Sequence, residues 1–350
     1  MNKTGIPALD SIIAATNKAF GKDFSSQDFG DVTRLQTGSA RLDAMIAGGL
    51  PKAGIIEIFG WESSGKTSLA LSIIARRQKE RKKLGITGKR DLFIDLEHSM
   101  TRSFIEGFGI DMDEVIWVRP DLAEEALQIA IDYPKSGAID MMLFDSVDAA
   151  QNSKMVSRQV GENDVGGISK DMNFALRQLS KIAVQTETTC IFINQIKQSP
   201  NVMGGNPNTT TGGNALKFYA LVRFELLRGK PSEVLPGAMM MRIKIAKTKV
   251  SMPYHGKPIE LDFIYGKGFD PALDLMNYAK SLGILRFAGS ATKVTWEPGG
   301  EEETESLCTG GKAGFMEWLQ DEENFEKIRI ACLKFDPFTA NPEETEDATD

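Results

Sequence analysis

The sequence predicts an α/β protein with a mostly parallel, twisted sheet covered by helices on both faces. Between residues 50 and 265, apolar segments of strand length alternate with segments of helical periodicity. The later apolar segments follow one another with little helix between them, which indicates an antiparallel edge. The predicted strands are 55–59, 91–96, 115–118, 140–144, 189–194, 220–227 and 240–247, and the predicted helices are 66–82, 122–133 and 169–186.

Two smaller regions flank this central domain, which we place at residues 36–269. Residues 1–35 contain a candidate amphipathic helix from Ile6 to Phe20, with Leu9, Ile12, Ile13 and Phe20 on its apolar side. An exposed apolar stripe docks either on the protein's own core or on a neighbouring subunit, and the sequence leaves both open.

The region after the central domain predicts a small α+β C-terminal domain at residues 270–335. Helical segments at 272–282, 312–320 and 324–334 surround a strand segment that contains Trp296. Residues 336–350 are strongly acidic, which is typical of a disordered tail.

The composition is that of a globular protein without a membrane span. The chain has 350 residues, of which 41% are hydrophobic and 25% charged, and no apolar run is long enough to cross a bilayer. Its three cysteines are widely spaced, which favours a reducing cytoplasm over a disulfide or zinc framework. Much of the net charge of −7 comes from two acidic runs, so the charge does not exclude nucleic-acid binding elsewhere.

A phosphate-binding loop follows the first predicted strand of the central domain. Residues 60–67 read GWESSGKT and match the pattern G-x-x-x-x-G-K-[ST] between a strand and a helix. The glycines allow backbone N–H groups to turn inward, Lys66 reaches the β- and γ-phosphates, and Thr67 ligates Mg²⁺. The alternative is a glycine-rich turn that binds nothing. The predicted nucleotide-binding residues of the loop are Gly60, Trp61, Glu62, Ser63, Ser64, Gly65, Lys66, Thr67 and Ser68.

Two carboxylates follow other strands at the same predicted edge of the sheet. Asp145 ends the strand at 140–144 and is a candidate Mg²⁺ partner beside Thr67, although an aspartate here could instead cap a following helix. Glu97 is the best-placed candidate to orient and polarise an attacking water, with Asp95 as the structural alternative. His98 more often caps a turn than acts on a substrate.

Three further polar residues stand at strand ends or edges. Gln195 ends the strand at 189–194 and opens a long loop, where a neutral amide can sense the γ-phosphate. Lys247 and Lys249 alternate along an edge strand and therefore project to the same side. Solvated edge lysines that block aggregation are the alternative.

Two polar, glycine-rich stretches, at 157–167 and 197–213, are too long to be simple connections. Long loops inside a compact domain are usually functional or disordered.

Together these segments resemble the RecA recombinase family. The residues that carry the resemblance are GWESSGKT at 60–67, FIDLEH at 93–98, FDSV at 144–147, FINQI at 192–196 and NPNTTTGGNALKFY at 206–219. The last segment is the most specific, because helicases and generic P-loop ATPases do not carry it. The likeness spans roughly residues 6–333.

The resemblance implies a role for each matching residue. Glu97 is the hydrolytic carboxylate, Gln195 the switch between nucleotide and DNA, and residues 157–166 and 197–211 the two DNA loops. The implied DNA contacts are Lys170, Arg177, Lys197, Thr211, Gly212, Gly213 and Asn214. The implied subunit-interface residues are Lys217, Phe218, Lys247 and Lys249, of which the last two reach the neighbour's phosphates.

The implied activity is DNA-dependent ATP hydrolysis by a cytoplasmic protein that uses ATP and Mg²⁺. It forms helical filaments on single-stranded DNA, pairs this strand with homologous double-stranded DNA and exchanges strands. A repressor and a single-strand-binding protein are further implied partners. The acidic tail is expected to compete for the basic DNA path. A hexameric translocase or helicase, and a filament that mainly promotes repressor cleavage, are the alternative functions.

Several positions depart from the family pattern. Phe104 stands where a tyrosine usually stacks on adenine, and Thr101 replaces an aspartate near the base. In the second loop, Pro200, Gly204 and Asn208 differ from the usual residues, and the stretch 79–90 is longer and more basic. These differences indicate a divergent member of bacterial or phage origin.

Overall fold

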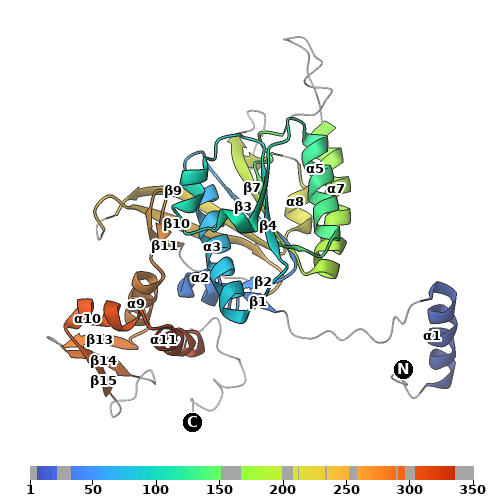
Figure 1. Cartoon of the computed structure of the whole chain (residues 1–350). Helices are drawn as coiled ribbons and strands as arrows, with labels where there is room; N and C mark the ends of the chain where they lie inside the picture. The colour runs from blue at the N-terminus through green and yellow to red at the C-terminus, as the bar shows by residue number, and fades with distance from the viewer. Residues whose placement is uncertain are drawn as a thin grey trace. The chain divides into compact units, whose positions relative to one another are not determined.

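The computed structural model describes residues 6–21, 33–150, 167–198, 208–211, 213–232, 235–251, 258–288, 291–295 and 304–335. The chain divides into two compact units, Met1–Thr33 and Arg34–Asp350. The first unit contains helix α1 (Pro7–Phe20), drawn in dark blue in Figure 1. Pro7 favours the first helical turn, and Gly21 ends the helix with a left-handed φ of 61°.

The second unit is organised around one large sheet. Its order is β12-β11-β10-β9-β3-β7-β6-β4-β5, with β8 paired to β7 off this path. The pairs from β9 through β3, β7, β6 and β4 to β5 are parallel, and those from β9 to β12 are antiparallel. The strands are β3 (Gly54–Gly60), β4 (Arg90–Asp95), β5 (Val115–Val118), β6 (Ile139–Asp145), β7 (Thr189–Gln198), β8 (Asn208–Thr210), β9 (Val222–Pro231), β10 (Met239–Thr248), β11 (Ile259–Ile264) and β12 (Gly268–Phe269).

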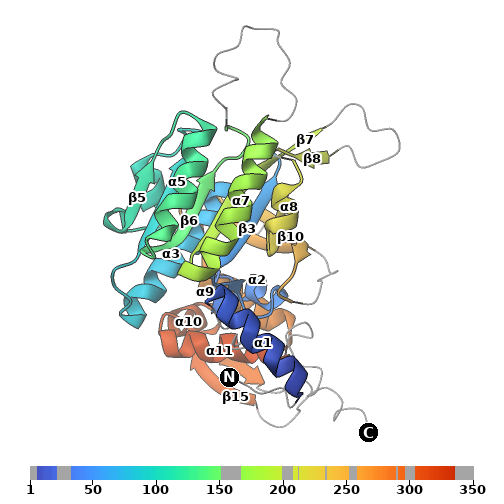
Figure 2. The ribbon, with the colours of Figure 1, turned by 90° about the vertical axis from the view of Figure 1, so that its right-hand side faces the viewer.

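Helices cover both faces of this sheet, as Figures 1 and 2 show. Alternate residues of each strand point to opposite faces, so Ile56 and Ile58 of β3 pack with α3 (Lys66–Leu84). Ile55 of β3 packs instead with α5 (Ala123–Lys135) and α7 (Gly167–Thr186). The predicted α/β class, the parallel sheet and the antiparallel edge are thus confirmed. Cys190 of β7 lies in the buried core.

The sequence analysis missed several short elements of the second unit. Its short helices depend mainly on local caps: Ser39 accepts a hydrogen bond from the backbone N–H of Leu42, and Thr101 accepts one from Phe104. The strand β11 was missed because it depends on pairing with β10, which lies earlier in the chain. Besides the strands β8, β11 and β12, the additional elements are β1 (Arg34–Leu35), α2 (Ala40–Met45), β2 (Leu50–Pro51), α4 (Arg102–Glu106), the 3-10 helix η1 (Met112–Glu114) and α8 (Ala215–Tyr219).

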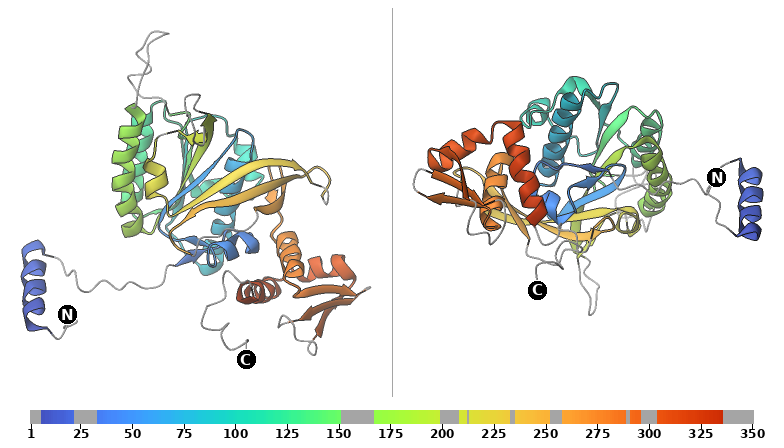
Figure 3. Two further views of the ribbon diagram at one scale, coloured as in Figure 1. Left: turned by 180° about the vertical axis from the view of Figure 1, so that it is seen from behind. Right: turned by 90° about the horizontal axis from the view of Figure 1, so that it is seen from below.

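In the C-terminal part, the described residues form a three-stranded antiparallel sheet and three helices, drawn in orange and red in Figure 3. These elements share an apolar cluster with Ala40 and Ala44 of α2. Trp296, expected in a strand, lies outside the described residues, as does the acidic tail at 336–350. The elements are α9 (Pro271–Ser281), β13 (Leu285–Ala288), β14 (Ala291–Thr295), β15 (Thr304–Thr309), α10 (Gly311–Trp318) and α11 (Glu322–Phe335).

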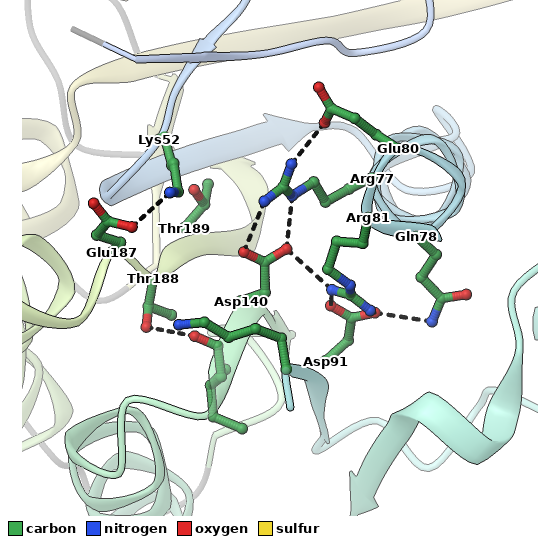
Figure 4. A network of polar contacts seen from close by, with 12 residues as sticks. Lys52, Arg77, Gln78, Glu80, Arg81, Asp91, Asp140, Glu187, Thr188 and Thr189 are labelled. Atoms are coloured by element: carbon green, nitrogen blue, oxygen red, sulfur yellow. Dashed lines mark hydrogen bonds and ion pairs between the residues drawn. The ribbon is translucent and has the colours of Figure 1, made fainter. Parts of the chain in front are cut away.

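A buried ionic cluster, shown in Figure 4, joins the polar second half of α3 to strands β4 and β6. The guanidinium of Arg81 lies 2.6 Å from Asp91 Oδ1 and 3.0 Å from Asp140 Oδ2. Arg77 donates to the same Asp140 carboxylate over 2.7 Å. Arg81 is only 1% exposed, so its charge depends on these partners rather than on water.

We expect Arg81→Met to lower the free energy of unfolding by about 3–5 kcal/mol, because Asp91 and Asp140 would lose their shared buried cation. Chemical denaturation measures this loss. The matched control is Arg102→Met, which removes an exposed guanidinium paired with Glu106 and should cost less than about 1 kcal/mol. Equal losses in the two variants would contradict the prediction.

A second polar junction connects α2 to the C-terminal part. Ser39 Oγ donates to Asp274 Oδ2 over 2.7 Å, and the N–H and hydroxyl of Thr37 donate to Asp43 Oδ1 over 2.9 and 2.7 Å. Burial raises the pKa of Asp43 to about 7, although the two bonds from Thr37 act in the opposite direction. Burial also raises the pKa of Asp274. The folded protein therefore holds protons here that the unfolded chain releases near pH 4.

The stability that Asp43 contributes is therefore expected to be present below about pH 4 and lost as the pH rises through about 7. Asp43→Asn removes this titration. The unfolding free energy of the variant relative to the native protein should consequently increase between pH 4 and pH 7, by at most about 4 kcal/mol. Denaturation at several pH values tests this, with exposed Asp121→Asn as control. A difference that does not change with pH would contradict it.

Candidate nucleotide and nucleic-acid site

A cleft of about 810 Å³ lies where several parallel strands end. Most of the predicted phosphate loop contributes to its wall, together with Glu97, Phe104, Asp145 and Gln195. Gly60 and Trp61 stand just outside the wall. The structure thus brings together residues from four predicted strand ends. The loop residues that line the cleft are Glu62, Ser63, Ser64, Gly65, Lys66, Thr67 and Ser68.

The phosphate loop has the backbone that its sequence predicts. A Cβ at Gly60 would lie 2.4 Å from the carbonyl oxygen of Leu226, so a side chain there has no room. Gly65 has a left-handed φ of 90° immediately before α3, whose free N–H groups and dipole favour an anion. Lys66 is buried and donates to the carbonyl oxygen of Trp61 over 2.8 Å. Burial lowers its pKa, while the nearby Asp145 and Glu97 oppose this effect.

Thr67 and Asp145 lie together at the floor of the cleft. Thr67 Oγ1 donates to Asp145 Oδ2 over 2.8 Å, whereas Asp145 Oδ1 is buried and has no hydrogen-bond partner among the described residues. Burial raises the pKa of Asp145 to about 7; Glu97 and Asp95 add to this rise, and Thr67 and Lys66 oppose it. A divalent cation would satisfy the free oxygen and favour the charged carboxylate, so the pair fits Mg²⁺.

Among the described residues, no three His, Cys, Asp or Glu side chains form a metal-binding cluster. Mg²⁺ commonly uses one or two protein oxygens and completes its coordination with phosphates and water. The donor set of one hydroxyl and one carboxylate suits that arrangement.

Glu97 is exposed at the cleft, and its Oε1 accepts a 2.6 Å hydrogen bond from Ser146 Oγ. The alternative, Asp95, is fully buried and lies 3.2 Å from Arg119 Nε, out of reach of a solvent molecule. His98 lies 3.4 Å from the carbonyl oxygen of Pro120, consistent with a turn residue. Sequence reasoning missed Ser146, although its position directly after Asp145 was a usable signal.

Gln195 lies opposite Gly60 in the register of β3 and β7, so it borders both the phosphate loop and the DNA-loop segment. The adjacent Asn194 Nδ2 donates to Glu57 Oε1 and to the Thr211 carbonyl, each over 3.0 Å. Glu57 is fully buried and also pairs with Arg223. The sequence analysis did not predict this series of hydrogen bonds. The one sequence signal for it was Glu57, an acidic residue within the apolar strand β3.

Aromatic side chains form the outer wall of the cleft. Phe104 is half-buried, and the ring of Tyr265 lies 5.2 Å from it between centroids. Thr101 also lines the cleft. Tyr265 was missed because its segment, between β11 and β12, is distant in sequence.

Most of the predicted DNA-contacting residues fall on α7 and on the segment before α8. Lys170 and Arg177 are exposed on α7, and the first turn of α7 approaches Gly213, where a Cβ would lie 3.1 Å from Ser169 Oγ. Asn214 precedes α8. Lys197 lies near the end of β7, paired with Thr209 of β8. Gly212, the first loop at 157–166 and residues 199–207 of the second, including Pro200 and Gly204, lie outside the described residues.

Phe174, also missed, is 68% exposed on α7, between Lys170 and Arg177. Its spacing of four residues from one and three from the other places all three on one helix face.

The predicted interface lysines lie apart from the cleft. Lys247 donates to the carbonyl oxygens of Lys217 and Phe218, and Lys249 donates to that of Phe218 over 2.8 Å. They therefore cap the end of α8, where positive charge is favourable. Burial, with Lys249 and Arg223 nearby, lowers the pKa of Lys247 to about 8. The ring of Phe218 is 69% exposed.

Comparison with known proteins gives a consistent family. The model of the RecA N-terminal domain matches residues 7–270. Protein RecA of Deinococcus radiodurans is 40% identical over 291 residues, covering 81% of this chain and 78% of that protein. Protein RecA of Thermus thermophilus is 36% identical over 345 residues, covering 95% of this chain and 96% of that protein. In the described part of the chain, no helix has the length and apolar character to cross a membrane.

Proposed function

Because the chain belongs to the RecA family of homologous recombination and strand-exchange proteins, we propose that it is a DNA-dependent ATPase that forms helical filaments on single-stranded DNA. The observation that carries the proposal is the meeting of Lys66, Thr67, Asp145 and Glu97 in one cleft. Gln195 of the same cleft directly follows Asn194, which bonds to Thr211.

The chain's own residues divide the hydrolytic work. The N–H groups of residues 62–68 and the ammonium of Lys66 hold the phosphates of ATP, and Phe104 with Tyr265 covers the base. Thr67 and Asp145 hold Mg²⁺, which when bound neutralises phosphate charge. Glu97, oriented by Ser146, positions the water and accepts its proton, giving ADP and phosphate.

Assembly completes this site in the proposed mechanism. Lys247 and Lys249 of one subunit reach the γ-phosphate of the next subunit and stabilise the charge that develops there. To do so they exchange the α8 carbonyls for phosphate oxygens, which are stronger partners. Lys217 and Phe218 complete the contact between subunits, and α1 provides an exposed apolar face for docking.

The proposed DNA path runs along α7 and the start of α8. Lys170, Arg177 and Lys197 pair with phosphates, and Thr211, Gly213 and Asn214 approach the backbone of the strand. Phe174 offers an aromatic ring between two cations, a combination that suits stacking on unpaired bases. Gly212 and the loop segments 157–166 and 197–211 extend this path to single- and double-stranded DNA.

The remaining assignments follow the family. We place the N-terminal segment at 1–35, the ATPase core at 36–269, a C-terminal domain at 270–335 and an acidic tail at 336–350 that competes with DNA. The protein acts in the cytoplasm, and repressors or single-strand-binding proteins are its further partners.

The decisive experiment measures ATP hydrolysis with and without single-stranded DNA, together with electron microscopy of the same samples. The proposal requires strong stimulation by DNA and helical filaments. Closed rings with directional unwinding would support a translocase instead. A rate of ATP hydrolysis that is the same with and without DNA would contradict the recombinase mechanism. Cleavage of a repressor added to the filaments tests the regulatory alternative separately.

A further inference from the structure

The carboxylate of Asp148 binds two of the side chains that we propose to contact DNA, those of Lys197 and Thr211. Asp148 Oδ1 accepts a hydrogen bond from Thr211 Oγ1 over 2.5 Å and lies 2.5 Å from Lys197 Nζ. Asp148 comes three residues after Asp145, while Lys197 is the second-last residue of β7 and Thr211 directly follows β8. One oxygen therefore joins an ammonium and a hydroxyl from the first and the last residue of the proposed second DNA loop, 197–211.

The geometry resembles that of a bound phosphate. A phosphate oxygen is an anionic acceptor, and hydroxyl and ammonium groups are its usual donors in nucleic-acid sites. The same two donors here hold a carboxylate instead. The Asp148 side chain is 18% exposed and that of Lys197 is 57% exposed, so solvent and a ligand can reach the pair.

We propose that Asp148 sets the DNA affinity of this protein by acting as an internal competitor that the phosphate backbone must displace from Lys197 and Thr211. The inference rests on the proposed function, since it assumes that these two residues bind DNA. It goes beyond that function by assigning to Asp148 a part that opposes binding.

Two simpler interpretations make different predictions. If Asp148 only braces the ends of β7 and β8 in the correct geometry, its removal should weaken DNA binding. If it acts only as one more negative charge near the DNA path, removing a neighbouring carboxylate should have the same effect as removing Asp148. Asp171 provides that comparison, because it is exposed on α7 next to Lys170.

The test compares the native protein with Asp148→Asn, Asp148→Ala and Asp171→Asn. Binding of a fluorescently labelled oligothymidine is followed by anisotropy, with Mg²⁺ and a non-hydrolysable ATP analogue. Both Asp148 variants should bind at an about three- to tenfold lower protein concentration, since one charge-assisted contact no longer has to be broken. Asp171→Asn should change the midpoint by less than about twofold.

Two further measurements test whether Asp148 changes the DNA affinity through Lys197 and Thr211. The slope of the logarithm of the binding constant against the logarithm of the salt concentration should become steeper in Asp148→Asn, by up to about 0.7. In the native protein, Asp148 takes up a cation from solution when DNA displaces it from Lys197, and this uptake offsets part of the counterion release from DNA. The variant has no carboxylate to do so. In a Lys197→Ala/Thr211→Val background, Asp148→Asn should not increase the DNA affinity further, because the two side chains that the substitution would free for DNA are absent. Thermal unfolding and binding of the ATP analogue verify that each variant is folded.

Unchanged or weaker binding by folded Asp148 variants would overturn the proposal in favour of a brace. An equal gain from Asp171→Asn, or a gain that persists in the double-variant background, would overturn it in favour of simple charge. Absence of DNA binding by the native protein under the same conditions would refute the proposed function itself, and the inference with it.

Discussion

Lys66→Ala is expected to reduce the rate of ATP hydrolysis by at least about a hundredfold, because the phosphates would lose their only charged ligand within the loop. The side chain is buried beside Asp145, so water cannot replace its ammonium effectively. Alanine also removes the Lys66 donor from the carbonyl oxygen of Trp61, which keeps only the longer, 3.3 Å bond from Ser64 N–H among those described. Steady-state hydrolysis in the presence of single-stranded DNA measures the loss.

The matched control for this variant is Lys79→Ala. Lys79 is exposed on the same helix, α3, but far from the cleft, and its removal should change the rate by less than about twofold. Hydrolysis by folded Lys66→Ala at a near-native rate would show that the cleft binds ATP in another way.

The second large effect is expected from Glu97→Gln. The amide can still accept the hydrogen bond from Ser146 but cannot take a proton from water, so the rate should fall about a hundred- to ten-thousandfold. Affinity for ATP should remain nearly native, since Glu97 is exposed at the cleft and its described hydrogen bond is to Ser146 rather than to the phosphate loop. The experiment pairs single-turnover hydrolysis with equilibrium binding of a fluorescent ATP analogue.

Asp121→Asn is the control for Glu97→Gln, because it removes an exposed carboxylate beyond β5 without entering the cleft. A parallel loss of binding and hydrolysis in Glu97→Gln would assign Glu97 to ATP binding instead. Ser146→Ala should lower the rate by a smaller factor, since it removes only the bond that orients the carboxylate.

The elements that the sequence predicted well are those whose formation depends on residues adjacent along the chain. The strands β3 and β6 are continuous apolar runs, and α7 has an apolar stripe at helical spacing, so each could be recognised in isolation. The phosphate loop could be recognised from the sequence equally well, because its glycines, Lys66 and Thr67 all lie within one turn between a strand and a helix. Asp145 and Glu97 followed from their positions at strand ends.

Other elements depended on partners distant in the chain. The strand β11 exists because β10 offers it an edge, and β12 adds only two residues to that edge. One side of the polar second half of α3 is buried because Asp91 and Asp140 meet Arg81 there. Hydrophobic periodicity contains no information about such pairs.

The sequence by itself determined the class of the fold, the phosphate-loop motif and the candidate metal and water-positioning carboxylates, because each is encoded by residues adjacent along the chain. Only the tertiary structure decided which side chains act together. The order of strands β3, β7, β6 and β4 brings Ser146 to Glu97, Asn194 to Thr211, and Asp148 to Lys197. Strand order is fixed by packing of the whole sheet, so these pairings cannot be read from any one segment.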